Sequence, residues 1–224
     1  MKNEKPQKNI KVKEKPLKNF FKNMEITFGV LLLIICCTFL IILSTFVQLD
    51  IIHFILPMEI FKGVKLNYSD FLYTYKIIPQ IPVVMFVGAF LGRKYGITCI
   101  ILYILLGLFV MPVFALGGGP HYVLEYGFGY ILAYIPAVFF MSSILKSGFS
   151  NRNIIHSILV GVLTIHIIGI LYMLFIAGLM HEGREFVIGW ICAQSGAKIA
   201  YDMVLSFATV FLAKYLKVIA WAVK

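Results

Sequence analysis

Long apolar runs alternate with short polar segments along most of this chain of 224 residues. Six runs are long enough to approach or cross the ~30 Å hydrocarbon core of a bilayer as helices. They occupy residues 29–47, 78–92, 97–116, 128–145 and 154–180, with the sixth inside 186–213. Because the runs are continuous rather than alternating, they predict membrane helices and not the strands of a β-barrel.

Composition leads to the same class of protein. Hydrophobic residues make up 61% of the chain and charged residues only 13%, and the mean hydropathy is +0.93. These values lie far outside the range of soluble domains. The sequence therefore predicts an all-α integral membrane protein, with residues 24–224 forming a single bundle of six transmembrane helices.

The first 23 residues differ sharply from the rest of the chain. They carry eight lysines and almost no apolar side chains before Phe20, so they cannot bury enough surface to fold alone. We expect residues 1–23 to form a disordered basic tail that is attracted to anionic lipid headgroups. The apolar run that follows is too long for the core of a signal peptide and lacks a small-residue cleavage site, so we expect it to stay in the mature chain.

The distribution of lysine and arginine predicts the orientation in the membrane, because these residues are retained on the cytoplasmic side when they lie in short loops. With the N-terminus inside, the inner segments hold 15 of the 20 cations. The outer segments hold only Lys62, Lys65, Lys76 and Arg184. Both termini are therefore predicted to be cytoplasmic. The net charge of +10 is mostly this topology signal and gives no support to nucleic-acid binding.

Several kinds of chemistry find little support in the sequence. The four cysteines lie in apolar runs without disulfide or metal-ligand spacing. His156 and His166 lie ten residues apart, which places them roughly 80° apart around a helix, and no third ligand is nearby. No phosphate-binding loop of the G-x-x-x-x-G-K-[ST] type occurs. We expect no metal and no resident cofactor, and any transport must be powered by a partner.

Charged and polar side chains inside the membrane are costly and are therefore candidates for function. Lys198 and Asp202 stand four residues apart in the last run, on one helix face, and Gln80 begins the second run. All three are predicted to lie in the outer half of the bundle. Two interpretations remain open: Lys198 and Asp202 neutralise each other in a salt bridge, or the three residues line a binding pocket.

A catalytic alternative rests on Ser195, which lies in the segment Ala-Gln-Ser-Gly. This segment resembles the Ser-Gly of intramembrane serine proteases, and His166 on the preceding helix is a possible base. Two features disfavour a protease. Ala193 stands where such proteases have glycine, and the histidine precedes the serine in the chain.

One long segment carries several motifs together, namely VGAFLGRKYGITCIILYILLGLFVMPVFALGGGPHYVLEYGFGYILAYIPAVFF. It contains an LG-basic-x-x-G turn at 91–96, a YxxLGLxxxPVF helix at 103–114, a glycine cluster at 117–119 and a GYxLxxxP segment at 129–136. With these motifs, residues 70–217 resemble the BioY family, the biotin-binding S components of energy-coupling factor (ECF) transporters.

The resemblance implies a function and a set of partners. A member of this family captures biotin outside a bacterial-type cell membrane and works with a transmembrane T component and two ABC-type ATPase subunits. An S component of the same fold for another small vitamin remains an alternative, because pocket residues rather than the fold set the ligand.

The resemblance departs from the family at the last helix, where Gly-Asp-x-x-Lys is common. Asp202 matches the acid, but Tyr201 replaces the glycine and Leu205 replaces the lysine. We expect Lys198, one turn away from Asp202 on the same face, to supply the missing cation for the biotin carboxylate.

The break at Gly117, Gly118 and Gly119 has a physical interpretation as part of a binding site. Irregular backbone at membrane depth is tolerated where it lines a cavity or is buried in protein, and glycine lets backbone N–H groups approach a ligand. Tyr122 and Tyr130 offer flat apolar surfaces with polar tips, which suit the fused rings of biotin. The predicted substrate-binding residues are Gln80, Gly117, Gly118, Gly119, Tyr122, Tyr130, Lys198 and Asp202.

Overall fold

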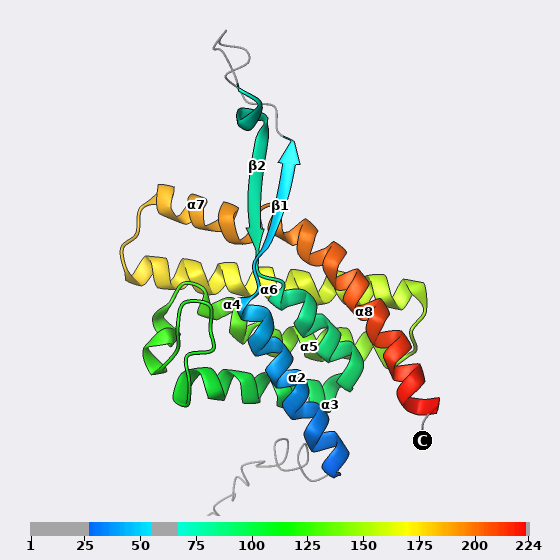
Figure 1. Cartoon of the computed structure of the whole chain (residues 1–224). Helices are drawn as coiled ribbons and strands as arrows, with labels where there is room; N and C mark the ends of the chain where they lie inside the picture. The colour runs from blue at the N-terminus through cyan, green and yellow to red at the C-terminus, as the bar shows by residue number, and fades with distance from the viewer. Residues whose placement is uncertain (1–26, 55–66, 223–224) are drawn as a thin grey trace, which may run out of the picture.

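The computed structural model describes residues 27–54 and 67–222 (Figure 1). The predicted basic tail, residues 1–23, lies outside the described residues. The long helices are α2 (Phe28–Phe46), α3 (Gln80–Phe109), α5 (Tyr134–Leu145), α6 (Asn151–Leu179), α7 (Arg184–Ser195) and α8 (Lys198–Ala222). Shorter elements are β1 (Leu49–Phe54), η2 (Tyr68–Phe71), β2 (Leu72–Ile77), η3 (Pro120–Leu124) and α4 (Phe128–Leu132).

Five helical segments of the described chain are long and apolar enough to cross a membrane. They cover residues 28–46, 80–109, 128–145, 151–179 and 184–219. Many large apolar side chains on these segments are exposed, including Phe39 on α2 and Phe175 on α6. Exposed apolar surface of this extent fits contact with lipid rather than with water. The protein is thus a mostly helical membrane protein, as the hydropathy pattern predicts.

Helix α3 reverses direction at Gly92. This residue has φ 73° and ψ −174°, a positive φ that glycine adopts without strain. Gln80 and Tyr103 are hydrogen-bonded across 2.6 Å, whereas 23 residues of straight helix would separate them by about 34 Å. The two arms of α3 therefore lie side by side. Their junction falls at the end of the second predicted run and before the start of the third.

A two-stranded hairpin is the one departure from an all-α fold among the described residues. Strands β1 and β2 pair antiparallel, from Leu49 opposite Ile77 to Phe54 opposite Leu72, and the hairpin projects from the end of α2 (Figure 1). The Tyr75 hydroxyl donates to the backbone oxygen of Ala193 at 2.7 Å. The sequence predicts helices alone, so the two strands correct the all-α prediction.

The α3 hairpin lies at the centre of the bundle and packs against α2, α5 and α8, while α6 covers α4, α5 and α8. Close packing uses glycine where two helices meet. A Cβ atom on Gly161 of α6 would lie 2.7 Å from the sulfur of Met85 and 3.5 Å from Cβ of Met141. The resulting core includes the fully buried side chains of Met85, Ile100 and Met141.

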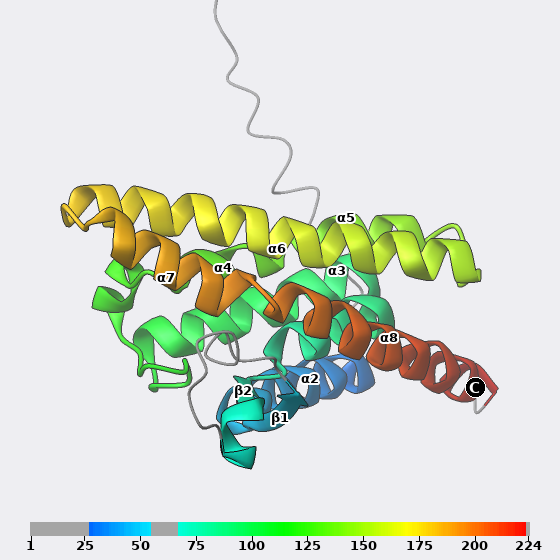
Figure 2. The same ribbon diagram turned by 90° about the horizontal axis from the view of Figure 1, so that it is seen from above.

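The loops gather at two opposite ends of the bundle. The turn between α5 and α6 and the C-terminal end of α8 lie at one end (Figure 2). The segment between α3 and α4 and the turn between α6 and α7 lie at the other. We refer to these as the α5–α6 end and the glycine-loop end.

Candidate functional site

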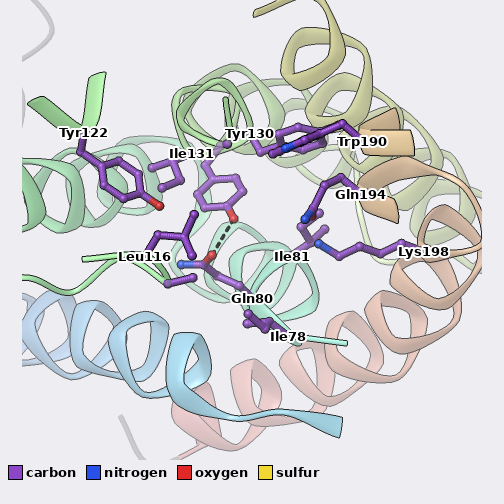
Figure 3. Close-up of a pocket in the computed structure, with 13 residues that line it drawn as sticks. Ile78, Gln80, Ile81, Leu116, Tyr122, Tyr130, Ile131, Trp190, Gln194 and Lys198 are labelled. Carbon is purple, nitrogen blue, oxygen red and sulfur yellow. Dashed lines mark hydrogen bonds between the residues drawn. The ribbon is translucent and has the colours of Figure 1, made fainter. Parts of the chain in front are cut away.

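A cavity of about 200 Å³ lies between the start of α3, the segment that follows α3, α4, and the junction of α7 with α8 (Figure 3). Most of its surface is apolar. The lining residues are Ile78, Gln80, Ile81, Ala115, Leu116, Tyr122, Gly127, Tyr130, Ile131, Tyr134, Trp190, Gln194 and Lys198. An apolar cavity with a few polar groups has the character of a small-molecule site.

The amide of Gln80 is held in one orientation by three neighbours. Its Nε2 donates to Thr45 Oγ1 at 2.9 Å and to Tyr103 Oη at 2.6 Å. Its Oε1 accepts from the Tyr134 hydroxyl at 2.9 Å, the bond drawn in Figure 3. Because an amide nitrogen has two protons and an amide oxygen two lone pairs, one lone pair of Oε1 remains for a ligand. Gln80 can therefore accept a hydrogen bond in the cavity but not donate one.

Tyr130 lies at the cavity end of a buried series of hydrogen bonds that reaches α8. Its hydroxyl shares a hydrogen bond with Ser195 Oγ at 2.7 Å, and Ser195 Oγ lies 2.9 Å from His166 Nδ1. On the far side of the ring, His166 Nε2 lies 3.3 Å from Asp202 Oδ2. His166 and Asp202 are at most 1% exposed. This hydrogen-bond series thus joins α4, α7, α6 and α8 behind the cavity wall.

Either hydroxyl can donate in the bond between Tyr130 and Ser195, and the roles of the two His166 ring nitrogens depend on the tautomer. A phenol oxygen has one proton and two lone pairs. In either direction, the bond to Ser195 leaves at least one lone pair of Tyr130 Oη for a donor in the cavity.

The Ser195, His166 and Asp202 side chains come together in the order of a catalytic triad, but their surroundings do not suit catalysis. Ser195 is only 4% exposed and does not line the cavity. Its Oγ is engaged by both His166 and Tyr130. A nucleophile must reach the reacting carbon, and here Tyr130 occupies the cavity side of the serine.

Lys198 stands at the first turn of α8 and is the one charged residue among the described residues that line the cavity. Figure 3 shows its ammonium group directed toward Gln194. Asp202, one turn later, is fully buried and pairs with His166. The salt bridge between Lys198 and Asp202 that their spacing allows does not form, and Asp202 Oδ2 pairs with His166 of α6 instead.

The glycine cluster supports the cavity from outside its lining. Gly117 and Gly119 have φ values of 121° and 96°, and Gly119 N donates to the Gly107 oxygen at 2.8 Å. A Cβ atom on Gly118 would lie 2.6 Å from that same oxygen and 2.7 Å from Cα of Pro112. The cluster therefore folds the chain tightly against the end of α3, next to Phe114.

Tyr122 follows this turn and reaches the cavity. Its ring packs against Phe114, with 4.6 Å between the ring centroids. Burial raises the pKa of the Tyr122 phenol, and a backbone hydrogen bond with Leu116 opposes part of that rise. The hydroxyl is thus neutral at physiological pH. Tyr122 presents an apolar ring with an uncharged polar tip to the cavity.

A family model described as the BioY family matches residues 18–221 of the chain. The chain belongs to the BioY family. Its relative from Lysinibacillus sphaericus, described as a probable biotin transporter BioY, is 26% identical over an alignment of 144 residues, and the match covers 61% of this chain and 71% of the relative. The family resemblance carried by the motifs is confirmed.

A solved structure gives the corresponding comparison of folds. The crystal structure of the S-component for biotin from an ECF-type ABC transporter matches with a TM-score of 0.60 and 22% identity. The match covers 86% of this chain and 94% of the other. This BioY family member therefore shares its fold with that S component.

Within this BioY family member, the structure brings four of the eight predicted site residues into one cavity: Gln80, Tyr122, Tyr130 and Lys198. The other four lie outside the lining. Gly118 and Gly119 border a separate depression with Gly107 and Pro120, Gly117 closes a bridge with Phe114, and Asp202 lies behind Tyr130.

Sequence reasoning missed Trp190, Gln194 and Tyr134 as lining residues. Trp190 and Tyr130 lie with their ring centroids 6.0 Å apart, on α7 and α4. Close packing makes room for this pair, since a Cβ atom on Gly169 of α6 would lie 2.5 Å from the Tyr130 ring. The large apolar ring and the polar N–H of tryptophan were a usable signal for Trp190. Nothing in the local sequence distinguishes Tyr134 from the other tyrosines.

Proposed function

We propose that this protein is the biotin-binding S component of an ECF-type biotin transporter, and that the cavity beside Lys198 is the biotin site. The observation that carries the proposal is the convergence, in a member of the BioY family, of one cation with four aromatic rings in a single cavity. These rings belong to Tyr122, Tyr130, Tyr134 and Trp190. The protein acts as a transport subunit rather than as an enzyme.

The chemistry of the lining matches the parts of biotin. The fused rings pack against Tyr122, Tyr130 and Trp190, and the carboxylate of the valerate chain pairs with Lys198. The ureido N–H groups need acceptors, and Gln80 Oε1 and Tyr130 Oη each keep a free lone pair for them. Gly117, Gly118, Gly119 and Asp202 act by positioning, because each supports a lining residue from outside the cavity.

The topology we propose has six transmembrane helices, with the two arms of α3 counted separately, and both termini in the cytoplasm. The α5–α6 end then faces inward, and the cavity opens toward the outside. Support comes from the charges, since Arg93, Lys146, Arg152 and Lys217 are among the cations of the predicted inner segments. Residues 24–224 form this membrane domain and residues 1–23 the basic tail.

Uptake requires partners, because the chain contains no nucleotide-binding motif. We propose that a T component and two ABC-type ATPases power it in a bacterial-type cell membrane. Biotin is the transported substrate and no further cofactor takes part. Reconstituted alone, the chain should bind biotin without accumulating it. ATP-dependent accumulation by the chain alone would contradict the assignment.

Calorimetric titration of the purified protein tests the ligand. Biotin should bind, and thiamine, riboflavin and pantothenate should not. Preferential binding of one of these vitamins would replace biotin while keeping the S-component role. A serine-reactive fluorophosphonate probe separates the protease alternative, because the engaged and buried Ser195 should stay unlabelled.

A further inference from the structure

A second cavity, of about 150 Å³, lies at the α5–α6 end, away from the proposed biotin site. It is bordered by the turn of α3 at Gly92, the end of α5 and the last part of α8. Nothing in the transport role described above uses this cavity.

Three cations from three different helices line it: Arg93 of α3, Lys146 at the end of α5 and Lys217 of α8. Arg93 lies over the ring of Phe139, with its guanidinium carbon 5.2 Å from the ring centroid. Lys217 lies 5.3 Å from the centroid of Phe149, and its ammonium donates to the Ala89 oxygen at 3.3 Å. These contacts orient two of the three charges at the cavity rather than leaving them as free surface chains.

No carboxylate of the described chain compensates this charge. In the described ranges, the one ion pair joins His166 and Asp202, near the other cavity. Glu125, Glu182 and Glu185 belong to the glycine-loop end. Three cations around one cavity repel one another unless an anion lies between them. The arrangement therefore suits an anionic ligand.

The surface around the cavity favours a ligand with acyl chains. Phe139, whose ring lies under Arg93, is 41% exposed. On a membrane protein, such apolar surface faces lipid tails, and basic pockets between helix ends bind anionic headgroups. A soluble phosphate would leave this surface without a partner.

We propose that this cavity binds the phosphate group of an anionic phospholipid, with Arg93, Lys146 and Lys217 around the phosphate and the acyl chains along Phe139. The site would fix the lipid at the end of the bundle that we propose faces the cytoplasm. The proposal stands apart from biotin binding, because it uses none of the residues of the first cavity.

The test is a titration of the detergent-solubilised full-length protein with phosphatidylglycerol, read by native mass spectrometry. Arg93→Gln/Lys146→Gln removes two cavity charges. Arg152→Gln/Lys214→Gln removes two charges from the predicted inner segments outside the cavity lining and serves as the matched control. The first pair should weaken phosphatidylglycerol binding by about tenfold or more, and the control pair by less than about threefold. Biotin affinity in both variants shows that the fold is intact.

Three outcomes would overturn the proposal. An equal loss in both pairs would mean that binding depends on the general charge of this end. Equal binding of phosphatidylcholine, which has no net charge, would remove the role of the cations. Displacement of the lipid by an equal concentration of glycerol 1-phosphate would make the ligand a soluble phosphate and not a lipid.

Discussion

Lys198 offers the sharpest test of the proposed biotin site. In the described part of the chain it is the one cation that lines the cavity, and Asp202, the acid nearest to it in sequence, is engaged by His166. Replacing Lys198 by methionine keeps the length of the side chain and removes its charge. The variant should therefore lose a partner of the biotin carboxylate without losing a salt bridge of the fold.

The expected loss can be worked out from the burial of the pair. Removing one member of a buried charge pair costs about 2–5 kcal/mol, partly because the other charge is left without a partner. At about 1.4 kcal/mol per tenfold change in affinity, the lower bound corresponds to roughly 30-fold weaker binding. Biotinamide has no carboxylate, so Lys198→Met should weaken its binding far less.

Calorimetric titration of biotin and biotinamide against the purified variant measures both values. Lys214→Met is a control on the same helix, about 24 Å further along its axis, where the ammonium lies 5.5 Å from the centroid of Phe211. This control should bind both ligands like the unaltered protein. An equal loss of biotin and biotinamide in Lys198→Met, or no loss of either, would refute the carboxylate role of Lys198.

Three further predictions concern the Tyr130 hydroxyl, the glycine turn and the topology. Tyr130→Phe removes one acceptor for the ligand and should weaken biotin binding about three- to tenfold; unchanged affinity by calorimetry would exclude the proposed contact. Gly118→Ala places a Cβ atom against backbone and should destabilise the fold by about 1–3 kcal/mol, whereas Gly178→Ala, with nothing within 4 Å, should melt like the unaltered protein. In a background without the exposed native thiols, an impermeant maleimide added to whole cells should label Tyr68→Cys and not Ser147→Cys; the reverse pattern would invert the proposed orientation.

The sequence by itself determined the membrane class and most of the helix positions. Continuous apolar runs can satisfy their backbone hydrogen bonds in lipid only as helices, so residues 28–46 and 151–179 were recognisable from hydropathy alone. The reversal in α3 was also recognisable, because Gly92 and the basic pair after it interrupt two apolar runs. The combined motifs of residues 91–136 were enough to indicate the family.

Other features required the tertiary structure. Strands β1 and β2 stabilise each other by pairing. Residues 73–77 of β2 alternate apolar with polar side chains, but β1 shows no such alternation, and a single strand without a partner is not stable. The four-residue spacing of Lys198 and Asp202 put them on neighbouring turns of one helix, but it did not say which helix each would meet.

The packing of α8 against α7 and α6 decided the roles of Lys198 and Asp202. Lys198 entered the cavity because α8 begins there, and Asp202 paired with His166, 36 residues away in the chain. Local sequence carries the periodicity of a helix, whereas the partner of a buried charge depends on packing between helices that are distant in the chain.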